Sequence, residues 1–428
     1  MGIPGFFKFI KKDYPKCISD SKDFKQKIDF LYFDINGIIH NSKHKNIKIM
    51  FAKIKKKFES IIDVVNPNFI FIAIDGVAPM AKITQQRARR FRNLTPQNDF
   101  DGNAITPGTK FMNELNFFFK EYIKDKKNFF FSGSDTPGEG EHKIMVHLRT
   151  LKNEKIMIYG SDADLIMLGI ISHKQNVFIF REAEESHIIN IRFFKNLIKS
   201  DLLINESYDY ERVLDDWVFL CFLIGNDFLP HLPGLEIKNI WILFDLHKTI
   251  LLKTKKYLTY KGTIPLNHII LIMKHLNILL KNFNFNYYKT NFLLEESDVN
   301  FIKLIVNEYC KGLMWVLKYY YEGCPDWNWF YPFYYAPLVE DFALADIKVV
   351  FKLNKPLKPM EQLMCVIPIG SKKLLPKKYY DLMTADDSCI TDFYPIKFKG
   401  MKDWRHVAIL PFIDIGRLRR ELKKVQKK

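Results

Sequence analysis

The sequence lacks the marks of a secreted or membrane-spanning protein. Its six cysteines are scattered without a CxxC pair, which indicates a reduced compartment and argues against a disulfide framework or a zinc site. The N-terminus, MGIPGFFKFIKKDYP, has no long apolar core, so no signal peptide is expected. Apolar runs such as WVFLCFLIG are too short to cross a bilayer. We therefore expect an intracellular monomer without membrane association, in the cytoplasm rather than the nucleus.

Acidic residues are scarce relative to basic ones. The chain has 65 lysines and arginines against 48 aspartates and glutamates, which gives a net charge of +17. Such an excess favours a polyanionic partner, either nucleic acid or an anionic membrane surface. Hydrophobic residues make up 48% of the 428 residues, which is enough for sizeable cores, and this length predicts two packed units.

The first half alternates short apolar runs with helical patterns, which predicts an α/β fold with a parallel sheet flanked by helices. The expected strands cover residues 28–34, 68–75, 155–162 and 176–181, and the expected helices cover 46–64, 81–93, 108–124 and 139–151. Three of these strands end in an aspartate: Asp34, Asp75 and Asp162. Because ligands bind outside the carboxyl ends of strands in open α/β sheets, these acids are expected to be neighbours.

The remainder of the chain differs in composition. Residues 246–295 are rich in lysine, asparagine, leucine and isoleucine, and we expect a helical connector there. From residue 296 onward aromatic residues become dense, as in GLMWVLKYYYEGCPDWNWFYPFYYAP. The sequence therefore predicts three consecutive regions: an α/β region at 1–245, the connector at 246–295, and a mostly helical, aromatic-rich second region at 296–428 that packs against the first.

Several carboxylates occur in compact motifs, namely YFDING, IAIDG, PGEGEH, YGSDADLI and LIGNDFLPH. Taken singly, each has an ordinary alternative: a strand-terminal aspartate often only caps a helix, and the glutamate pair of PGEGEH would often be solvated charge. As a set they are better explained by divalent cations, because carboxylates beside apolar runs are costly without a partner. The acids are Asp34, Asp75, Glu139, Glu141, Asp162, Asp164 and Asp227.

Hard oxygen donors favour Mg²⁺ or Mn²⁺ over zinc. Seven carboxylates exceed the needs of one octahedral ion, and they suit two ions about 3.5–4 Å apart that clamp a phosphoryl displacement. In PGEGEHK the glycines would let the backbone turn tightly enough for both glutamates to face one site. His142 and Lys143 are expected only to support the metal ligands.

The helix expected at 81–93 carries a basic face directly after Asp75. Four of its polar side chains fall within roughly a quarter of the helix circumference, whereas Arg87 and Arg92 point elsewhere. A solvated basic face would be the ordinary explanation for an arbitrary helix. Its position beside a candidate metal ligand favours a phosphate pocket, because guanidinium groups bind phosphate bidentately. The four side chains are Lys82, Gln86, Arg89 and Arg90.

These motifs together resemble a known family. MGIPGFFKFIKKDYP, DINGIIH, IDGVAPMAKITQQRARRFR, ITPGTKFM, PGEGEHKIMVHLR, GSDADLIMLGI and GNDFLPHLPGLEI occur in the order found in eukaryotic 5′→3′ exoribonucleases of the Xrn, Rat and Pacman type. The second half is similar in QLMCVIPIGSKKLLP, ITDFYPIKF and VAILPFID. The chain resembles a minimal version of this family, in which the connector is short and Ser161 stands where leucine is usual.

The resemblance implies a PIN/FEN-like fold and a role for each motif. It assigns the seven carboxylates to two Mg²⁺ ions, for which Mn²⁺ would substitute, and Lys82, Gln86, Arg89 and Arg90 to the 5′-monophosphate of the substrate. It also implies that the terminal bases stack between His40 and a tryptophan of the second region. Trp404, with charged neighbours, is favoured for this role over Trp327, which lies among aromatic residues that predict core packing.

The activity implied is degradation of 5′-monophosphorylated single-stranded RNA to nucleoside 5′-monophosphates. Region 1–245 would then be the catalytic nuclease region, and region 296–428 would complete the active-site pocket. Two alternatives stay open: a flap-type DNA nuclease with a similar arrangement of acids, and a catalytically silent RNA-binding scaffold. The aromatic second region argues against the first alternative, and the intact set of acids argues against the second.

Overall fold

The computed structural model describes residues 2–92, 100–182, 185–202, 207–280, 286–292, 298–400 and 407–427. The chain divides into two compact units, each assembled from separate stretches. The first comprises Met1–Gln26, Met145–Asp326 and Tyr331–Leu353, and the second comprises Lys27–Ile144, Trp327–Phe330 and Asn354–Lys428. The three regions expected from the sequence describe chain order rather than compact units, and they stay a prediction.

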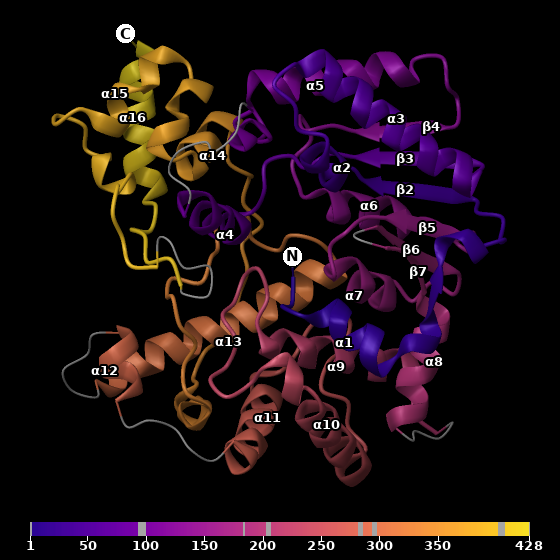
Figure 1. The fold of residues 1–428 in the computed structure, drawn as a ribbon. Coiled ribbons are helices and arrows are strands. Elements are labelled where there is room, and N and C mark those ends of the chain that lie inside the picture. Colours follow the sequence, from indigo (N-terminus) through magenta and orange to yellow (C-terminus); the bar gives the residue numbers. More distant parts are fainter. Residues whose placement is uncertain are drawn as a thin grey trace. The chain divides into compact units, whose positions relative to one another are not determined.

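The second unit is built on three parallel strands (Figure 1). Strand β2, Phe30–Asp34, pairs with β3, Phe69–Ala73, and β3 pairs with β4, Phe129–Ser132. Four of the five residues of β2 are buried, as expected for a parallel strand covered on both faces. The helices of this unit are α2 (Asn36–Asn41), α3 (Ile47–Val65), α4 (Met80–Phe91), α5 (Lys110–Ile123), α14 (Pro359–Val366), α15 (Asp381–Thr384) and α16 (Ile415–Lys427), and α6 (Gly140–Leu148) begins in it.

The first unit combines parallel and antiparallel strands. Strand β5, Ile156–Tyr159, pairs in parallel with β6, Val177–Glu182. Strand β7, Ser186–Asn190, runs antiparallel to β6, and β1, Ile18–Asp20, runs antiparallel to β7. The helices here are α1 (Phe6–Asp13), α7 (Asp164–Ile171), α8 (Ile191–Leu202), α9 (Tyr210–Cys221), α10 (Trp241–Thr254), α11 (Leu266–Leu279), α12 (Tyr287–Phe292) and α13 (Val299–Tyr321).

The predicted α/β architecture is confirmed: the four expected strands form as β2, β3, β5 and β6, and the four expected helices form as α3, α4, α5 and α6. Strands β1 and β7 were not predicted, and they add antiparallel pairings to the predicted parallel ones. Strand β4 was also not predicted. Residues 298–400 and 407–427 are mainly helical, as expected, and no helix in the described ranges has the length and apolar character needed to span a bilayer.

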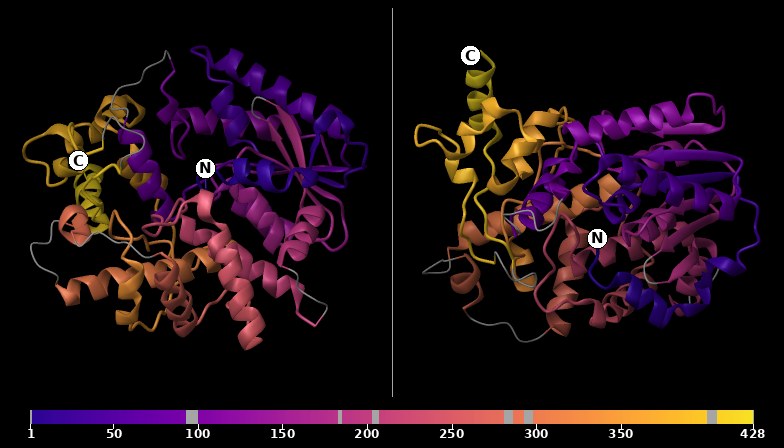
Figure 2. Two further views of the ribbon diagram at one scale, coloured as in Figure 1. Left: turned by 60° about the horizontal axis from the view of Figure 1, so that its bottom comes forward. Right: turned by 45° about the horizontal axis from the view of Figure 1, so that its top comes forward.

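Helix α4 is held firmly within the second unit. Its residue Ile83 is buried in a core that includes Leu363 of α14, and the two helices lie side by side (Figures 1 and 2). Arg87 extends on the same side, where its guanidinium donates to the carbonyl oxygen of Cys365 at 2.9 Å and lies over the Phe91 ring. Arg87 therefore points away from the predicted phosphate-binding face, as its helical position indicated, and helps to fix the orientation of that face.

Candidate active site

Two of the predicted metal ligands in the second unit are joined by one asparagine. Asp34, the last residue of β2, is 6% exposed, and its Oδ1 accepts a hydrogen bond from Asn36 Nδ2 at 3.1 Å. The Oδ1 atom of Asn36 accepts from the backbone N–H of Asp75, just beyond β3, at 3.4 Å. Asn36 thus links the carboxyl ends of two adjacent parallel strands. The expectation that Asp34 and Asp75 are neighbours is confirmed.

The loop that carries PGEGEHK closes over these two aspartates. The backbone N–H of Gly140, the first residue of α6, donates to Asp75 Oδ1 at 2.6 Å. A Cβ atom on Gly140 would lie 2.9 Å from Asp34 Oδ1 and 3.4 Å from Asp75 Oδ1, so only glycine fits without displacing a carboxylate. Gly138 has a φ of 110°, which favours glycine, so the tight turn expected here is confirmed at that position.

The side chain of Lys143 stabilises the same loop. Its ammonium donates to the carbonyl oxygens of Ile74 and Gly133, both at 2.8 Å, and this joins the end of β3 to the start of the loop. Burial lowers the pKa of Lys143 to about 8, although the charges of Asp75 and Asp135 oppose this shift. The side chain therefore supports the loop that positions the carboxylates, in keeping with the role expected from the sequence.

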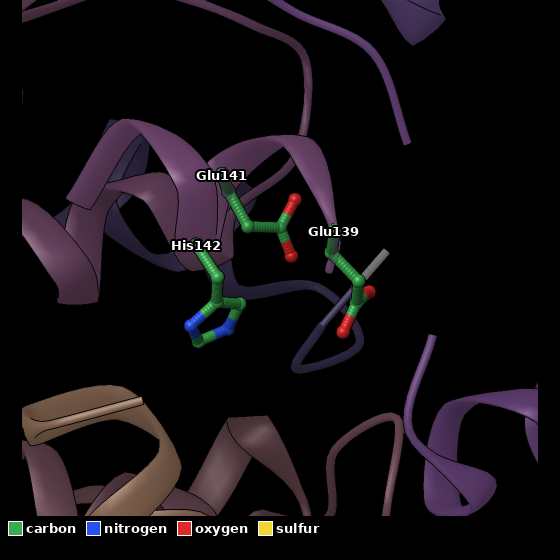
Figure 3. Close-up of side chains that lie close together, drawn as sticks. All are labelled: Glu139, Glu141 and His142. Atoms are coloured by element: carbon green, nitrogen blue, oxygen red, sulfur yellow. The ribbon is translucent and has the colours of Figure 1, made fainter. Parts of the chain in front are cut away.

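Glu139 and Glu141 are buried side chains, not solvated surface charge. Glu139 is 2% exposed and Glu141 is 6% exposed. Together with His142 they offer three ligand atoms that all lie within 4.8 Å of one another, and Figure 3 shows the two carboxylates close together beside the imidazole. Buried carboxylates at this spacing repel one another unless cations neutralise them, so the donor set fits a divalent cation. The structure adds His142 to the candidate ligands, and Mn²⁺ tolerates an imidazole ligand better than Mg²⁺ does.

One cation already lies beside this cluster. The Lys82 ammonium, on the first turn of α4, is 2.5 Å from Glu139 Oε2, and both side chains are buried. This ion pair places the predicted phosphate-binding face of α4 in direct contact with the predicted metal-binding acids. Gln86 lies one helical turn further along the same face and is also buried, with no hydrogen-bond partner for its Oε1 atom among the described residues. Rotation of the amide would present donors at that point.

The two arginines of this face differ in their surroundings. Arg89 is exposed, whereas Arg90 is partly buried and donates to the Thr106 hydroxyl at 2.6 Å and to the carbonyl oxygen of Ile105. Burial and the nearby Arg89 cation lower the pKa of Arg90 to about 9, which leaves the guanidinium charged at neutral pH. The four side chains predicted to bind phosphate thus share one face of α4, with its buried end at Lys82.

In the first unit, the N-terminal segment lies against two further predicted ligands. The backbone N–H of Gly2 donates to Asp227 Oδ1 at 3.2 Å. A Cβ atom on Gly2 would lie 1.3 Å from Asp164 Oδ1, and the φ of Gly2 is 73°, so a side chain is excluded on both grounds. Phe6 anchors the segment by packing on Trp217, with ring centroids 6.1 Å apart. Asp164 and Asp227 are therefore neighbours that share the contact with Gly2.

The two remaining acids of the first unit, Asp227 and Asp162, have different local surroundings. Asp227 follows Asn226, whose Oδ1 atom accepts from the backbone N–H groups of Phe228 and Leu229 at 2.9 and 3.0 Å and so fixes a tight turn. Asp162 lies between β5 and α7. Burial lowers the pKa of the Arg181 guanidinium, and the negative charge of Asp162 opposes that shift, which indicates that the two groups lie near each other.

Comparisons with known proteins agree with this arrangement of motifs. A family model described as the XRN 5′-3′ exonuclease N-terminus matches residues 1–99 and 93–183, and one described as the Xrn1 helical domain matches residues 207–283 and 277–428. The chain belongs to the Xrn family of 5′-3′ exonucleases. It is 31% identical to 5′-3′ exoribonuclease 1 of Homo sapiens, over 98% of this chain and 34% of that protein.

A second relative in the Xrn family is 5′-3′ exoribonuclease 2 of Gallus gallus, which is 29% identical over 99% of this chain and 70% of that protein. The chain thus spans about a third of the length of one relative and 70% of the other. Among solved structures, a T5 D15 protein co-crystallised with metal ions matches with a TM-score of 0.35 and 11% identity, over 54% of this chain and 80% of that one.

The base-stacking residues predicted for this Xrn-family chain are only partly described. His40 is exposed in the last turn of α2. Trp404 lies outside the described residues, so its role stays a prediction. Trp327 is partly buried, and its carbonyl oxygen accepts from the backbone N–H of Met80 at 2.9 Å, which ties it to the start of α4. Trp329 is buried.

Two positioning residues, Asn36 and Gly2, were not predicted from the sequence, and Gly140 was predicted only to allow the turn of PGEGEHK. Asn36 links Asp34 to Asp75, Gly140 leaves room for both carboxylates, and Gly2 leaves room for Asp164. The available signal was position alone: Asn36 and Gly140 each lie within two residues of a predicted ligand. Neither residue type carries metal-binding chemistry in this setting, so only the contacts reveal the roles.

Proposed function

We propose that this chain is a 5′→3′ exoribonuclease that hydrolyses 5′-monophosphorylated single-stranded RNA and releases nucleoside 5′-monophosphates. The observation that carries the proposal is the buried contact between Lys82 and Glu139. It joins a cationic face suited to a terminal phosphate to a carboxylate cluster suited to divalent cations. An exonuclease that binds the 5′-phosphate and cuts the first internucleotide bond needs these two sites next to each other.

The proposal assigns the seven carboxylates, including Glu141, to two Mg²⁺ ions, with Mn²⁺ able to substitute. When bound, such a pair of cations supplies Lewis acidity for the attacking water and for the departing oxygen. The acids of the second unit are fixed before binding by the hydrogen bonds of Asn36 and Gly140. Pre-set ligands of this kind reduce the reorganisation that binding and reaction require.

The α4 face would hold the terminal phosphate. Lys82 and Gln86 form its buried end, and Arg89 and Arg90 form its more open end. Binding the 5′-phosphate there fixes the distance from the chain end to the bond that is cut, so mononucleotides are the expected product. A compact pocket of this kind would admit one phosphate and exclude a cap or a triphosphate. The exposed ring of His40 would stack on a terminal base.

The test uses purified protein and four substrates: RNA with a 5′-monophosphate, a 5′-triphosphate or a 5′-hydroxyl, and a DNA flap. With Mg²⁺, degradation should be confined largely to the 5′-monophosphate RNA and should stop with EDTA or in Glu141→Gln. Preferential cutting of the flap would replace the proposal with a flap-type DNA nuclease. Absence of cleavage with both Mg²⁺ and Mn²⁺, while RNA still binds, would support a silent scaffold. We further propose that the protein acts as a cytoplasmic monomer, which size-exclusion chromatography and cell fractionation can test.

A further inference from the structure

The ion pair between Lys82 and Glu139 has a consequence for how the proposed site is loaded. The Lys82 side chain is 7% exposed and that of Glu139 is 3% exposed, so water screens this pair little. Lys82 is a predicted ligand of the 5′-phosphate, and Glu139 is a predicted ligand of a cation. Each residue therefore has a second partner to bind, and the present contact competes with both.

The other side chains of the α4 face leave Lys82 in a distinct position. Gln86, on the same face, has a buried amide oxygen without a partner among the described residues, and rotation of this amide would present an N–H donor to a phosphate. The guanidinium of Arg90 donates to Thr106 and Ile105. Lys82 is thus a deeply buried cation of the pocket whose charge is directed at a carboxylate. A phosphate dianion that approached Lys82 would also approach the Glu139 carboxylate, and the two anions would repel each other.

We propose that Glu139 holds Lys82 away from the 5′-phosphate until a divalent cation binds Glu139, so that binding of the cation and binding of the 5′-phosphate are positively coupled. A cation on Glu139 neutralises the carboxylate and leaves the Lys82 ammonium available to the phosphate. Because coupling between two binding sites is reciprocal, a bound 5′-phosphate also raises the affinity of the site for the cation. This inference rests on the proposed function and adds an order to the loading of its two sites.

The alternative is a purely structural ion pair that joins the first turn of α4 to the loop before α6. A structural pair would affect folding, but it would not make recognition of the 5′-phosphate depend on the charge of Glu139. The two explanations therefore differ in a binding measurement without metal. In that measurement no RNA is degraded, so turnover does not interfere.

The experiment measures fluorescence anisotropy of a labelled single-stranded oligoribonucleotide, with a 5′-phosphate or a 5′-hydroxyl, in EDTA. The quantity compared is the ratio of the two dissociation constants, which reports preference for the phosphate alone. Glu139→Gln should raise this preference about tenfold over the wild type, the scale of one released charge-assisted hydrogen bond. Glu141→Gln is the matched control, because it removes one buried carboxylate from the same cluster.

The dependence on Lys82 is tested in the double variant Lys82→Met/Glu139→Gln. This variant removes both partners and so leaves neither charge buried without the other, which favours folding, and circular dichroism checks the fold. The tenfold gain should disappear in it. The inference is overturned if Glu139→Gln and Glu141→Gln raise the preference equally, if the gain persists in the double variant, or if Glu139→Gln shows no gain.

A second measurement tests reciprocity in the wild type. Mn²⁺ binding is titrated calorimetrically with and without adenosine 5′-monophosphate, which has no internucleotide bond to cut. The nucleotide should tighten Mn²⁺ binding severalfold, and adenosine should not. Equal Mn²⁺ affinity in the two titrations would refute the coupling. If 5′-phosphorylated RNA is degraded but no coupling appears, only this inference fails, whereas absence of any RNA degradation refutes the proposed function.

Discussion

Replacing Gly140 by alanine should separate activity from stability. Gly140 begins α6 with its backbone N–H on Asp75, and an added Cβ would lie 2.9 Å from Asp34 Oδ1 and 3.4 Å from Asp75 Oδ1. Carbon and oxygen atoms at 2.9 Å are in strong repulsion, so the Asp34 carboxylate must move by about 0.5 Å, the tolerance within which catalytic groups are normally held. The methyl group therefore acts on the candidate site itself.

The expected loss of activity in Gly140→Ala follows from the displacement of the Asp34 carboxylate. A misplacement of about 1 Å costs ~100-fold in rate, so about 0.5 Å should cost ~10-fold in kcat of RNA degradation. Stability should change little. Alanine is favoured over glycine in a helix by about 1 kcal/mol, which offsets an overpacking cost of about 1–3 kcal/mol. The free energy of unfolding of Gly140→Ala should thus stay within about 2 kcal/mol of that of the wild type.

The assay pairs single-turnover degradation of 5′-phosphorylated RNA with urea unfolding. Gly416→Ala is the matched control: Gly416 lies in the first turn of α16, and its added Cβ would meet the Asp414 Oδ1 atom at 3.0 Å, away from the predicted ligands. The control should keep full activity. If Gly140→Ala retains wild-type kcat while folded, then the position of the Asp34 carboxylate does not limit the reaction and the reasoning fails.

Three further outcomes are expected. Asn36→Ala should weaken Mn²⁺ binding about 10–100-fold in calorimetry, because the link between two ligands is lost, and unchanged affinity would show that the link is dispensable. Gly2→Ala should reduce RNA degradation more than Gly140→Ala does, since its Cβ would lie 1.3 Å from Asp164 Oδ1, and equal activity of Gly2→Ala and wild type would contradict this. Burial lowers the pKa of Lys195 to about 8 in the folded protein. Between about pH 8 and 10.5 the unfolded protein therefore holds a proton on Lys195 that the folded protein has lost, so the stability of the wild type rises with pH over this range. The stability of Lys195→Met relative to that of the wild type should therefore fall by about 3 kcal/mol as the pH is raised from 7 to 10.5, as measured by urea unfolding. A pH-independent difference would show that the pKa of Lys195 is not lowered in the folded protein.

Periodicity was sufficient for the central strands and the helices beside them. Strand β2 has the sequence FLYFD, a run of apolar residues closed by an acid, and α4 carries its basic face at helical spacing. Both patterns are local, because they depend on which side chains repeat along one element. The same local information placed Asp34 and Asp75 at strand ends and excluded Arg87 from the phosphate-binding face. The structure confirms these placements within the second unit.

The unpredicted strands depend on pairing rather than on local pattern. Strand β4 is FFFS, a run too short to distinguish from buried helix, and β1 has the sequence ISD, only three residues long. Strand β1 forms because Ile18 pairs with Ile189 of β7, and no spacing along the chain specifies that partner. Antiparallel edge strands of this kind turn a parallel sheet into a mixed one without leaving a periodic signal.

The candidate site was predictable as a set of residues but not as a set of contacts. Helical angle predicted Lys82 as a phosphate ligand, and the motif PGEGEHK predicted Glu139 as a metal ligand, each from its own stretch of sequence. Nothing in either stretch indicates that the two side chains lie 2.5 Å apart. This contact affects both predicted binding sites, because Lys82 and Glu139 cannot each bind a new partner without losing the ion pair between them. In the proposed coupling, the order in which the cation and the RNA 5′ end bind is therefore a property of the folded unit, and it is measurable through one charge, that of Glu139.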